Sequence, residues 1–117
     1  MSIYIAGPMS GYEGMNFDAF NTAADDLRYT GWEVINPVDI NPDPNADWKE
    51  CMIKDIEALI HCEAMYMLIG WQESKGATLE HTIGSALGLD MYYEEDDYKN
   101  DNNGTDTAGN DGEAESA

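Results

Sequence analysis

Short apolar segments alternate with amphipathic segments over the first 93 residues, and this alternation constrains the fold more than any other feature. Four segments are short and rich in apolar or aromatic side chains, as buried strands are: residues 2–6, 32–36, 64–69 and 90–93. Apolar residues recur at helical spacing in three segments between them: residues 16–30, 48–61 and 78–89. The order β-α-β-α-β-α-β, with connections long enough for crossovers, predicts a parallel sheet with helices on both faces.

We therefore predict an α/β domain, a flavodoxin/Rossmann-like three-layer sandwich with a small parallel sheet of four to five strands. Strand order 2-1-3-4 is the expected arrangement. Open sheets of this kind bind ligands outside the carboxyl ends of the strands, at the point where the strand order reverses. That point would lie between the first and third strands.

The segment from residue 70 to residue 81 joins the third strand to the last helix and concentrates residues suited to a site. Gly76 would let the backbone approach a ligand closely. Ser74 and the free N–H groups at the helix start could hold an anion such as a phosphate. Glu80 would point a carboxylate into the same pocket.

The segment after the first strand is rich in glycine and also contains Pro8, Met9 and Ser10. Two interpretations stay open for it, a mobile connection or a loop that cradles a phosphate or ribose. The predicted strand order places this loop, with Gly7 and Gly11, opposite the turn at residues 70–76.

Residues 38–46 have no periodicity and are rich in Pro, Asn and Asp, so we predict a solvated loop there. Asp39 and Asp43 resemble metal ligands only in type, because their spacing fits no calcium loop. Asp47 is the predicted N-cap of the helix over residues 48–61. Asp55 lies beside the apolar stripe of that helix, either as a solvated flanking residue or as an inward-facing functional group.

Acidic residues outnumber basic ones by 24 to 5, which gives a formal net charge of −19. Residues 94–117 hold nine acids and one base, and we predict that they form a disordered acidic tail. Residues 1–93 still carry 15 acids and 4 bases, a net charge of −11. Such a surface argues against direct nucleic-acid binding, which needs Lys and Arg. Adaptation to a high-salt cytoplasm and mimicry of a nucleic-acid backbone both explain it.

The length of 117 residues fits one domain. No run of about 18 apolar residues and no charged N-terminal region occurs, so we expect no membrane span and no signal peptide. Cys51 and Cys62 make no disulfide framework, and we expect reduced thiols in a cytoplasmic protein.

Three motifs in order resemble the nucleoside 2-deoxyribosyltransferase superfamily: residues 3–11 (IYIAGPMSG), Asp55-Ile56, and Ser74-x-Gly76-x-x-x-Glu80. The sequence is most similar to a small branch known as DUF4406, common in phages and prophages, over residues 3–93. The spacing from Ser74 to Glu80 also resembles the enzymes that hydrolyse deoxynucleoside 5′-monophosphates.

The resemblance implies a role for each matching residue. Glu80 corresponds to the nucleophile that attacks C1′ of the deoxyribose and forms a glycosyl-enzyme ester. Asp55 corresponds to the acid that assists departure of the base, Tyr4 to a tyrosine that orients the nucleophile, and Ser74 to a contact with the 5′-phosphate. No metal or organic cofactor is implied. The candidate substrate-binding residues are Gly7, Pro8, Met9, Ser10, Gly11, Asn36, Trp71, Ser74, Lys75 and Gly76.

Several features depart from the family pattern. The transferases have an Asp near the position of Ser74, which favours a monophosphate over a free nucleoside here. His81 and Thr82 stand where a Leu-Gly or similar pair often follows the nucleophile in the family. A body of charge −11 would repel a nucleotide unless Lys75, Arg28 or backbone N–H groups offset it locally, and Lys75 is best placed.

Two functional hypotheses follow. The first is an N-glycosidase or deoxyribosyltransferase acting on a small deoxynucleotide or nucleoside, and the joint presence of Tyr4, Asp55 and Glu80 favours it. The second is a non-catalytic nucleotide-binding or acidic DNA-mimic module, which the charge favours. The resemblance and an exposed helical face also predict a homodimer or homotetramer.

Overall fold

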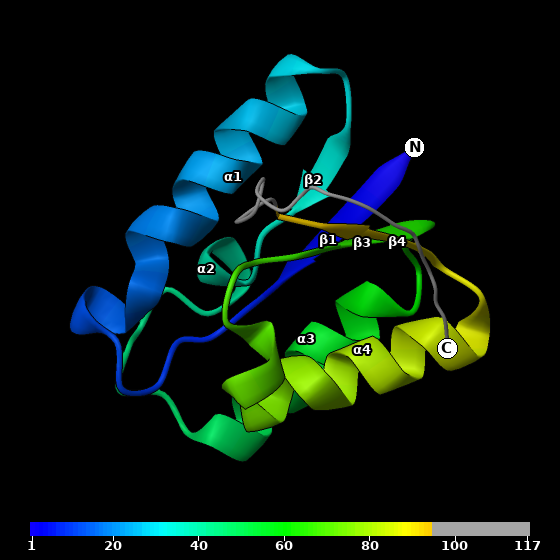
Figure 1. The fold of residues 1–117 in the computed structure, drawn as a ribbon. Helices are drawn as coiled ribbons and strands as arrows, with labels where there is room; N and C mark the ends of the chain where they lie inside the picture. The colour runs from blue at the N-terminus through cyan, green and yellow to red at the C-terminus, as the bar shows by residue number, and fades with distance from the viewer. Residues whose placement is uncertain (95–117) are drawn as a thin grey trace, which may run out of the picture.

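The computed structural model describes residues 1–94, which form a four-stranded, all-parallel sheet in the order β2-β1-β3-β4 (Figure 1). The strands are β1 (Ser2–Ala6), β2 (Glu33–Ile35), β3 (Ala64–Met67) and β4 (Asp90–Tyr93). β1 pairs with both β2 and β3 in parallel register. The predicted α/β fold and strand order are confirmed, and the strand order reverses between β1 and β3 as expected.

Helices cover both faces of the sheet, which makes three layers (Figure 1). α1 (Phe17–Tyr29) lies on one face, while α3 (Trp48–Leu59) and α4 (Lys75–Leu87) lie side by side on the other. The short α2 (Pro37–Ile40) follows β2 and contacts both α1 and α3. Because alternate residues of a strand point to opposite faces, β1 sends Ile5 toward α1 and Tyr4 toward α3 and α4.

The prediction of a loop over residues 38–46 is wrong at its start, where α2 forms. The side chain of Asn36 accepts a hydrogen bond from the N–H of Val38 at 3.1 Å, and Pro37 occupies the first helical turn. An N-cap followed by proline is a helix start signal, but four residues are too few to show a hydrophobic period.

α4 begins at Lys75, three residues before the predicted start, because Ser74 acts as its N-cap. The hydroxyl oxygen of Ser74 accepts from the N–H of Ala77 at 3.1 Å. The predicted cap of α3 is confirmed, since the carboxylate of Asp47 accepts from the N–H of Glu50 at 3.2 Å.

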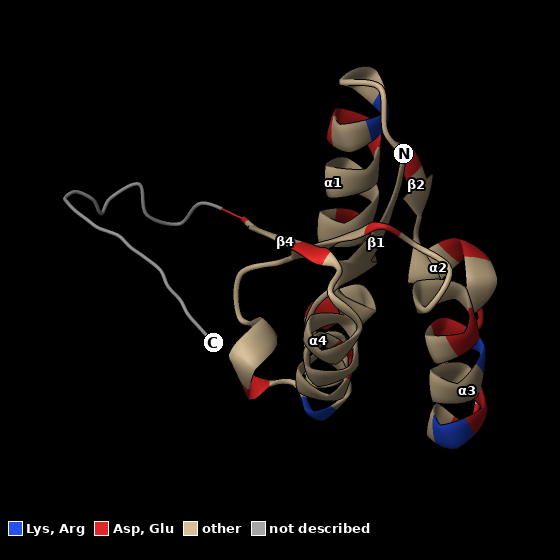
Figure 2. Ribbon diagram, turned by 90° about the vertical axis from the view of Figure 1, so that its right-hand side faces the viewer, with Lys and Arg blue, Asp and Glu red and all other residues tan. Residues whose placement is uncertain are grey.

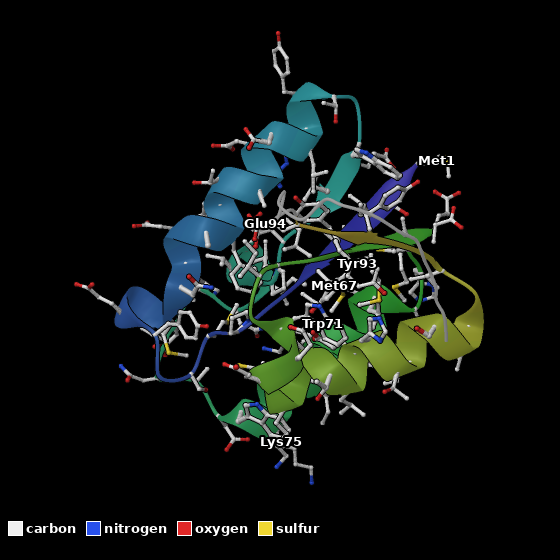
Figure 3. The ribbon with its side chains drawn as sticks, viewed as in Figure 1. Met1, Met67, Trp71, Lys75, Tyr93 and Glu94 are labelled. Atoms are coloured by element: carbon white, nitrogen blue, oxygen red, sulfur yellow. The ribbon has the colours of Figure 1, made fainter. Side chains whose placement is uncertain are left out.

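The last described residue, Glu94, extends the contact between β4 and β3 by one residue. Its N–H donates to the carbonyl of Met67 at 2.8 Å, and its carboxylate accepts from the N–H of Ile69 at 2.9 Å (labelled in Figure 3). The predicted acidic tail otherwise lies outside the described residues. Within residues 1–94, both cysteines are free and no helix is long and apolar enough to cross a membrane.

Candidate functional site

A cavity of about 400 Å³ opens at the carboxyl edge of the sheet, beside the point where the strand order reverses. The segment after β1 forms one wall, the beginning of α4 a second, and α3 with the preceding loop a third. Tyr4, Asp55 and Glu80 line it together. The volume lies within the range of roughly 300–1,000 Å³ that is typical of small-molecule sites.

Glu80 is placed on the inner side of α4, where its side chain is only 5% exposed. The phenolic O–H of the fully buried Tyr4 donates to Oε2 of Glu80 at 2.8 Å. Tyr4 comes from the central strand, so the hydrogen bond joins the sheet to α4 and fixes one carboxylate oxygen. The other oxygen has no hydrogen-bond partner among the described residues.

Asp55 lies on the inner side of α3 and is 8% exposed. Of the two positions that the sequence left open for Asp55, the structure therefore shows the inward-facing one. The side-chain amide of Asn41 donates to Oδ1 of Asp55 at 2.8 Å. Asn41 follows α2, so the irregular segment before α3 helps to orient the second carboxyl group. Sequence reasoning missed Asn41, because nothing local marks an Asn in a polar segment as the partner of an acid 14 residues away.

Burial raises the pKa of both carboxyl groups. The pKa of Glu80 rises to about 8, mainly because desolvation disfavours the charged form; the hydrogen bond from Tyr4 opposes the rise, and the charge of Asp55 adds to it. The pKa of Asp55 rises to about 7 through desolvation, opposed by the hydrogen bond from Asn41. Burial and the neighbouring Glu80 also raise the pKa of Tyr4, which keeps its proton as a donor. The pair therefore retains at least one proton at neutral pH.

Six of the ten predicted substrate-binding residues line the cavity: Gly7, Met9, Ser10, Gly11, Ser74 and Gly76. Gly7 is required for a different reason from ligand contact, because a Cβ atom there would lie 2.7 Å from Cβ of Leu68. Gly76 likewise permits close packing of α4 on α3, since its Cβ would lie 3.1 Å from Sδ of Met52.

Four predicted substrate-binding residues do not line the cavity: Pro8, Asn36, Trp71 and Lys75. The buried Asn36 caps α2 and donates to Asn21 at 3.0 Å, which is a structural role. Trp71 stacks on His81 with ring centroids 4.3 Å apart and lies close to Tyr93, with ring centroids 6.1 Å apart (Figure 3).

Lys75 begins α4, and its Nζ lies 4.6 Å from the ring centroid of Trp48, at the edge of the site (Figure 3). Trp48 itself lines the cavity, although sequence reasoning did not select it. Arg28 pairs instead with the exposed Asp39 at 3.3 Å, on the α1 side of the sheet. Lys75 is thus the nearer of the two cations that could offset the negative charge of a ligand.

The described residues that line the cavity include three acids and no Lys, Arg or His. The third acid, Asp43, is exposed in the loop before α3, where its carboxylate accepts from the N–H of Asn45 at 2.9 Å. Within residues 1–94, no group of three His, Cys, Asp or Glu side chains is arranged to hold a metal ion. Most of the remaining lining is apolar or glycine.

Fold and site together define a small α/β protein with two buried carboxyl groups facing one cavity at the carboxyl edge of a parallel sheet. Over residues 1–93 the chain matches the family model described as "Domain of unknown function (DUF4406)", and it therefore belongs to that family. A search of curated proteins gave no match.

Proposed function

We propose that this protein is an N-glycosidase or deoxyribosyltransferase that acts on a 2′-deoxynucleoside or its 5′-monophosphate, with Glu80 as nucleophile. The observation that carries the proposal is the hydrogen bond of 2.8 Å from Tyr4 to Glu80, in a cavity that Asp55 also lines. A retaining glycosidase needs one ionised and one protonated carboxyl group on either side of the scissile bond. Two buried carboxyl groups with raised pKa values supply such a pair.

In the first step, the free oxygen of Glu80 attacks C1′ while the bond from C1′ to the base nitrogen breaks. Asp55 donates its proton to the departing base, which leaves neutral, and a glycosyl ester forms on Glu80. In the second step, ionised Asp55 takes a proton from water as the water attacks C1′, and Glu80 leaves as a carboxylate. Attack by another base in place of water would give transfer.

Both pKa values are raised, so the pair holds one proton near neutral pH, and its position decides the roles. The reaction uses the singly protonated form in which Glu80 is ionised and Asp55 carries the proton. Two contacts favour that form. The O–H of Tyr4 stabilises ionised Glu80, and a base nitrogen placed against Asp55 would stabilise its protonated form by accepting the proton in a hydrogen bond.

The position of Asp55 also orients the substrate. Since Asp55 serves the leaving base, the base would lie toward α3, Asn41 and Trp48, all on one side of the cavity. The sugar and its 5′ group would then lie toward Ser10, Gly11 and the beginning of α4. At that end, the N–H of Gly76 and the hydroxyl of Ser74 could contact a 5′ oxygen.

The test is chromatographic detection of free base after incubation of the purified chain with each deoxynucleoside and each 5′-monophosphate, at low and high salt. We expect wild type to release one base, and Glu80→Ala to release it at least about 1,000-fold more slowly. Glu80→Gln is the matched control, because it keeps the size and the hydrogen-bond acceptor for Tyr4 but cannot attack. Release of no base by a folded wild type would contradict the proposal and favour a non-catalytic nucleotide-binding or acidic interaction module.

A further inference from the structure

The segment after β1 contains a turn of unusual backbone conformation, at the short 3-10 element η1 (Glu13–Asn16). Gly14, Met15 and Asn16 have φ angles of 59°, 56° and 61°, so three successive residues are left-handed. Within residues 1–94, Met15 and Asn16 are the only residues other than glycine with a positive φ. Asparagine tolerates this region because its short side chain can bond locally, but methionine has no such compensation. Met15 is therefore the strained residue of the turn.

Several contacts hold this turn in place. The N–H of Met15 donates to the carbonyl of Tyr12 at 3.0 Å. The side-chain amide of Asn16 donates to the carbonyl of Pro8 at 2.9 Å. The phenol of Tyr12 also packs against the turn after β3, where a Cβ atom on Gly70 would lie 2.8 Å from the phenolic oxygen. A left-handed conformation that the surrounding structure imposes on a residue other than glycine is typical of functional sites and ligand clamps.

The strained conformation does not place Met15 in the hydrophobic core. Met15 is half-buried and belongs to neither of the two hydrophobic clusters. Met9, from the same segment, packs against the cluster on the α1 side of the sheet. The side chain of Met15 lines the cavity instead. Core packing therefore does not offset the strain at this residue, and the surface that the turn places Met15 against is the interior of the cavity.

The wall of the cavity that carries Met15 has no cation. Residues 7–17 contain one charged side chain, that of Glu13, which is exposed and does not line the cavity. Within residues 1–94, the lysines and the arginine lie on α1, α3 and α4 (blue in Figure 2). The large side chains that this wall presents to the cavity are those of Met9, Met15 and Phe17. Because methionine is unbranched and polarisable, it packs closely against apolar surfaces of varied shape.

We propose that Met15 is a ligand-contacting residue, which the left-handed turn holds in the cavity, and that its thioether determines how tightly the site binds its substrate. The chemical class of that substrate rests on the proposed function, which places the base toward α3 and the sugar toward the segment after β1. In that placement, Met15 packs against the carbon atoms of the deoxyribose. The turn thus lowers the stability of the free protein and strengthens its contact with the ligand.

The first part of the test compares the thermal stability of Met15→Ala and Met15→Gly, two variants that both lack the methionine side chain. Only glycine adopts the left-handed region without strain. We expect Met15→Gly to melt about 4 °C or more above Met15→Ala, and no lower than wild type, when unfolding is followed by circular dichroism. Gly14→Ala is the matched control for the turn and should melt below wild type. A Cβ atom at Gly14 meets no atom within 4 Å but has to adopt a φ of 59°.

The second part measures binding by calorimetric titration of each deoxynucleoside into the full chain carrying Glu80→Gln, which has no nucleophile. The same titrations are repeated with each Met15 variant added to Glu80→Gln. We expect Met15→Ala and Met15→Gly each to raise the dissociation constant about tenfold, as the loss of one apolar side-chain contact would do. Met15→Leu keeps an apolar side chain of similar size, so the dissociation constant should stay within about threefold of that of Glu80→Gln alone.

Two results would overturn the inference: a dissociation constant that Met15→Ala leaves unchanged, or a Met15→Gly variant that melts below wild type and no higher than Met15→Ala. Base release with the same KM in wild type and Met15→Ala would likewise overturn it, while leaving the proposed function in place. Deoxynucleoside binding that Met15→Ala weakens, without base release by wild type, would contradict the proposed chemistry and support the inference. If no deoxynucleoside binds to Glu80→Gln, the inference fails together with the substrate class.

Discussion

The two faces of the sheet bury side chains of different kinds. Toward α1, the buried side chains include no ionisable group: the hydrophobic cluster consists of Ile5, Phe20, Ala23, Ala24 and Leu68, and the buried Asn36, which donates to Asn21 of α1, is neutral. Toward α3 and α4, the buried groups include the phenol of Tyr4 and the carboxyl groups of Asp55 and Glu80. Both faces are served by the same strand, because β1 alternates between them. The α1 side therefore stabilises the domain by burying apolar side chains, whereas the α3 and α4 side lowers its stability in part by burying ionisable groups.

The largest effect should come from breaking the apolar side. Phe20→Ala removes a side chain that is 1% exposed at the centre of the α1 cluster, and we expect a loss of about 3–5 kcal/mol in the free energy of unfolding. Because none of the five buried residues of this cluster is titratable, the loss should be the same at pH 5 and pH 8. Urea denaturation at both pH values measures it, with Tyr29→Ala as the exposed aromatic control. A loss that depends strongly on pH would contradict the comparison.

On the α4 side, removing a buried group should raise the free energy of unfolding at high pH, not lower it. Folding raises the pKa of Glu80 from 4.5 to about 8. Below about pH 4.5 the carboxyl group is protonated in both the folded and the unfolded chain, so it does not affect stability. Between about pH 4.5 and pH 8 it ionises more readily in the unfolded chain, and the folded state loses stability progressively. Glu80→Gln removes this cost. We expect the variant to exceed wild type in free energy of unfolding by on the order of 3 kcal/mol at pH 8.5, and to match it near pH 4. Denaturation curves at the two pH values decide, and a variant that is less stable at pH 8.5 would contradict the assignment.

A third prediction concerns the pH dependence of base release. Only the singly protonated pair can react, so kcat/KM should follow a bell-shaped curve with its maximum between about pH 7 and pH 8. Activity should fall about tenfold for each pH unit beyond either limb. Initial rates at low substrate concentration from pH 5 to pH 10 measure the curve, with Lys75→Gln as a variant of a residue outside the carboxyl pair. A rate that rises steadily to pH 10 would exclude Asp55 as the acid.

The hydrogen bond that joins the sheet to α4 gives a fourth, smaller effect. Tyr4→Phe keeps the ring in the core but removes the donor to Glu80, so we expect kcat/KM to fall roughly 10- to 30-fold. Because that hydrogen bond lowers the pKa of Glu80, the pH profile should also move to higher pH. A variant that lost activity without a shift in the profile would point to a packing role for Tyr4.

The smallest effect is expected at Asn41. Asn41→Ala removes the donor to Asp55, and the pKa of Asp55 should rise because the hydrogen bond lowers it. The pH profile should therefore move to higher pH, with a change of only about three- to tenfold in the maximum rate. Asn45→Ala is the control, since its side chain lies in the same loop and does not line the cavity. A pH profile that stays in place would show that Asn41 does not act through Asp55.

Much of the fold is determined by the local pattern of the sequence. Short apolar or aromatic runs marked the four strands, helical spacing marked α1, α3 and most of α4, and Asp47 was recognisable as the cap of α3. The order of these elements was enough to predict a parallel sheet, because strand-helix-strand units cross over with one hand. The start of α4 was missed by three residues, since Ser74 reads as a ligand contact as readily as a helix cap. The four-residue α2 was missed because it is too short to show a period.

The candidate site also has a part that the sequence predicts and a part that only the tertiary structure shows. The sequence alone selects Tyr4, Asp55 and Glu80 as candidate site residues, because each stands in a motif that resembles one of the nucleoside 2-deoxyribosyltransferase superfamily. It left open whether Asp55 faced inward, and it selected Asn36 and Trp71, which the fold uses for capping α2 and for packing beside α4. Only the tertiary structure decided that Asn41 holds Asp55, that Trp48 lines the cavity and that Glu80, the one acid of α4, is buried. These facts depend on contacts between elements far apart in the chain, which a local period does not encode.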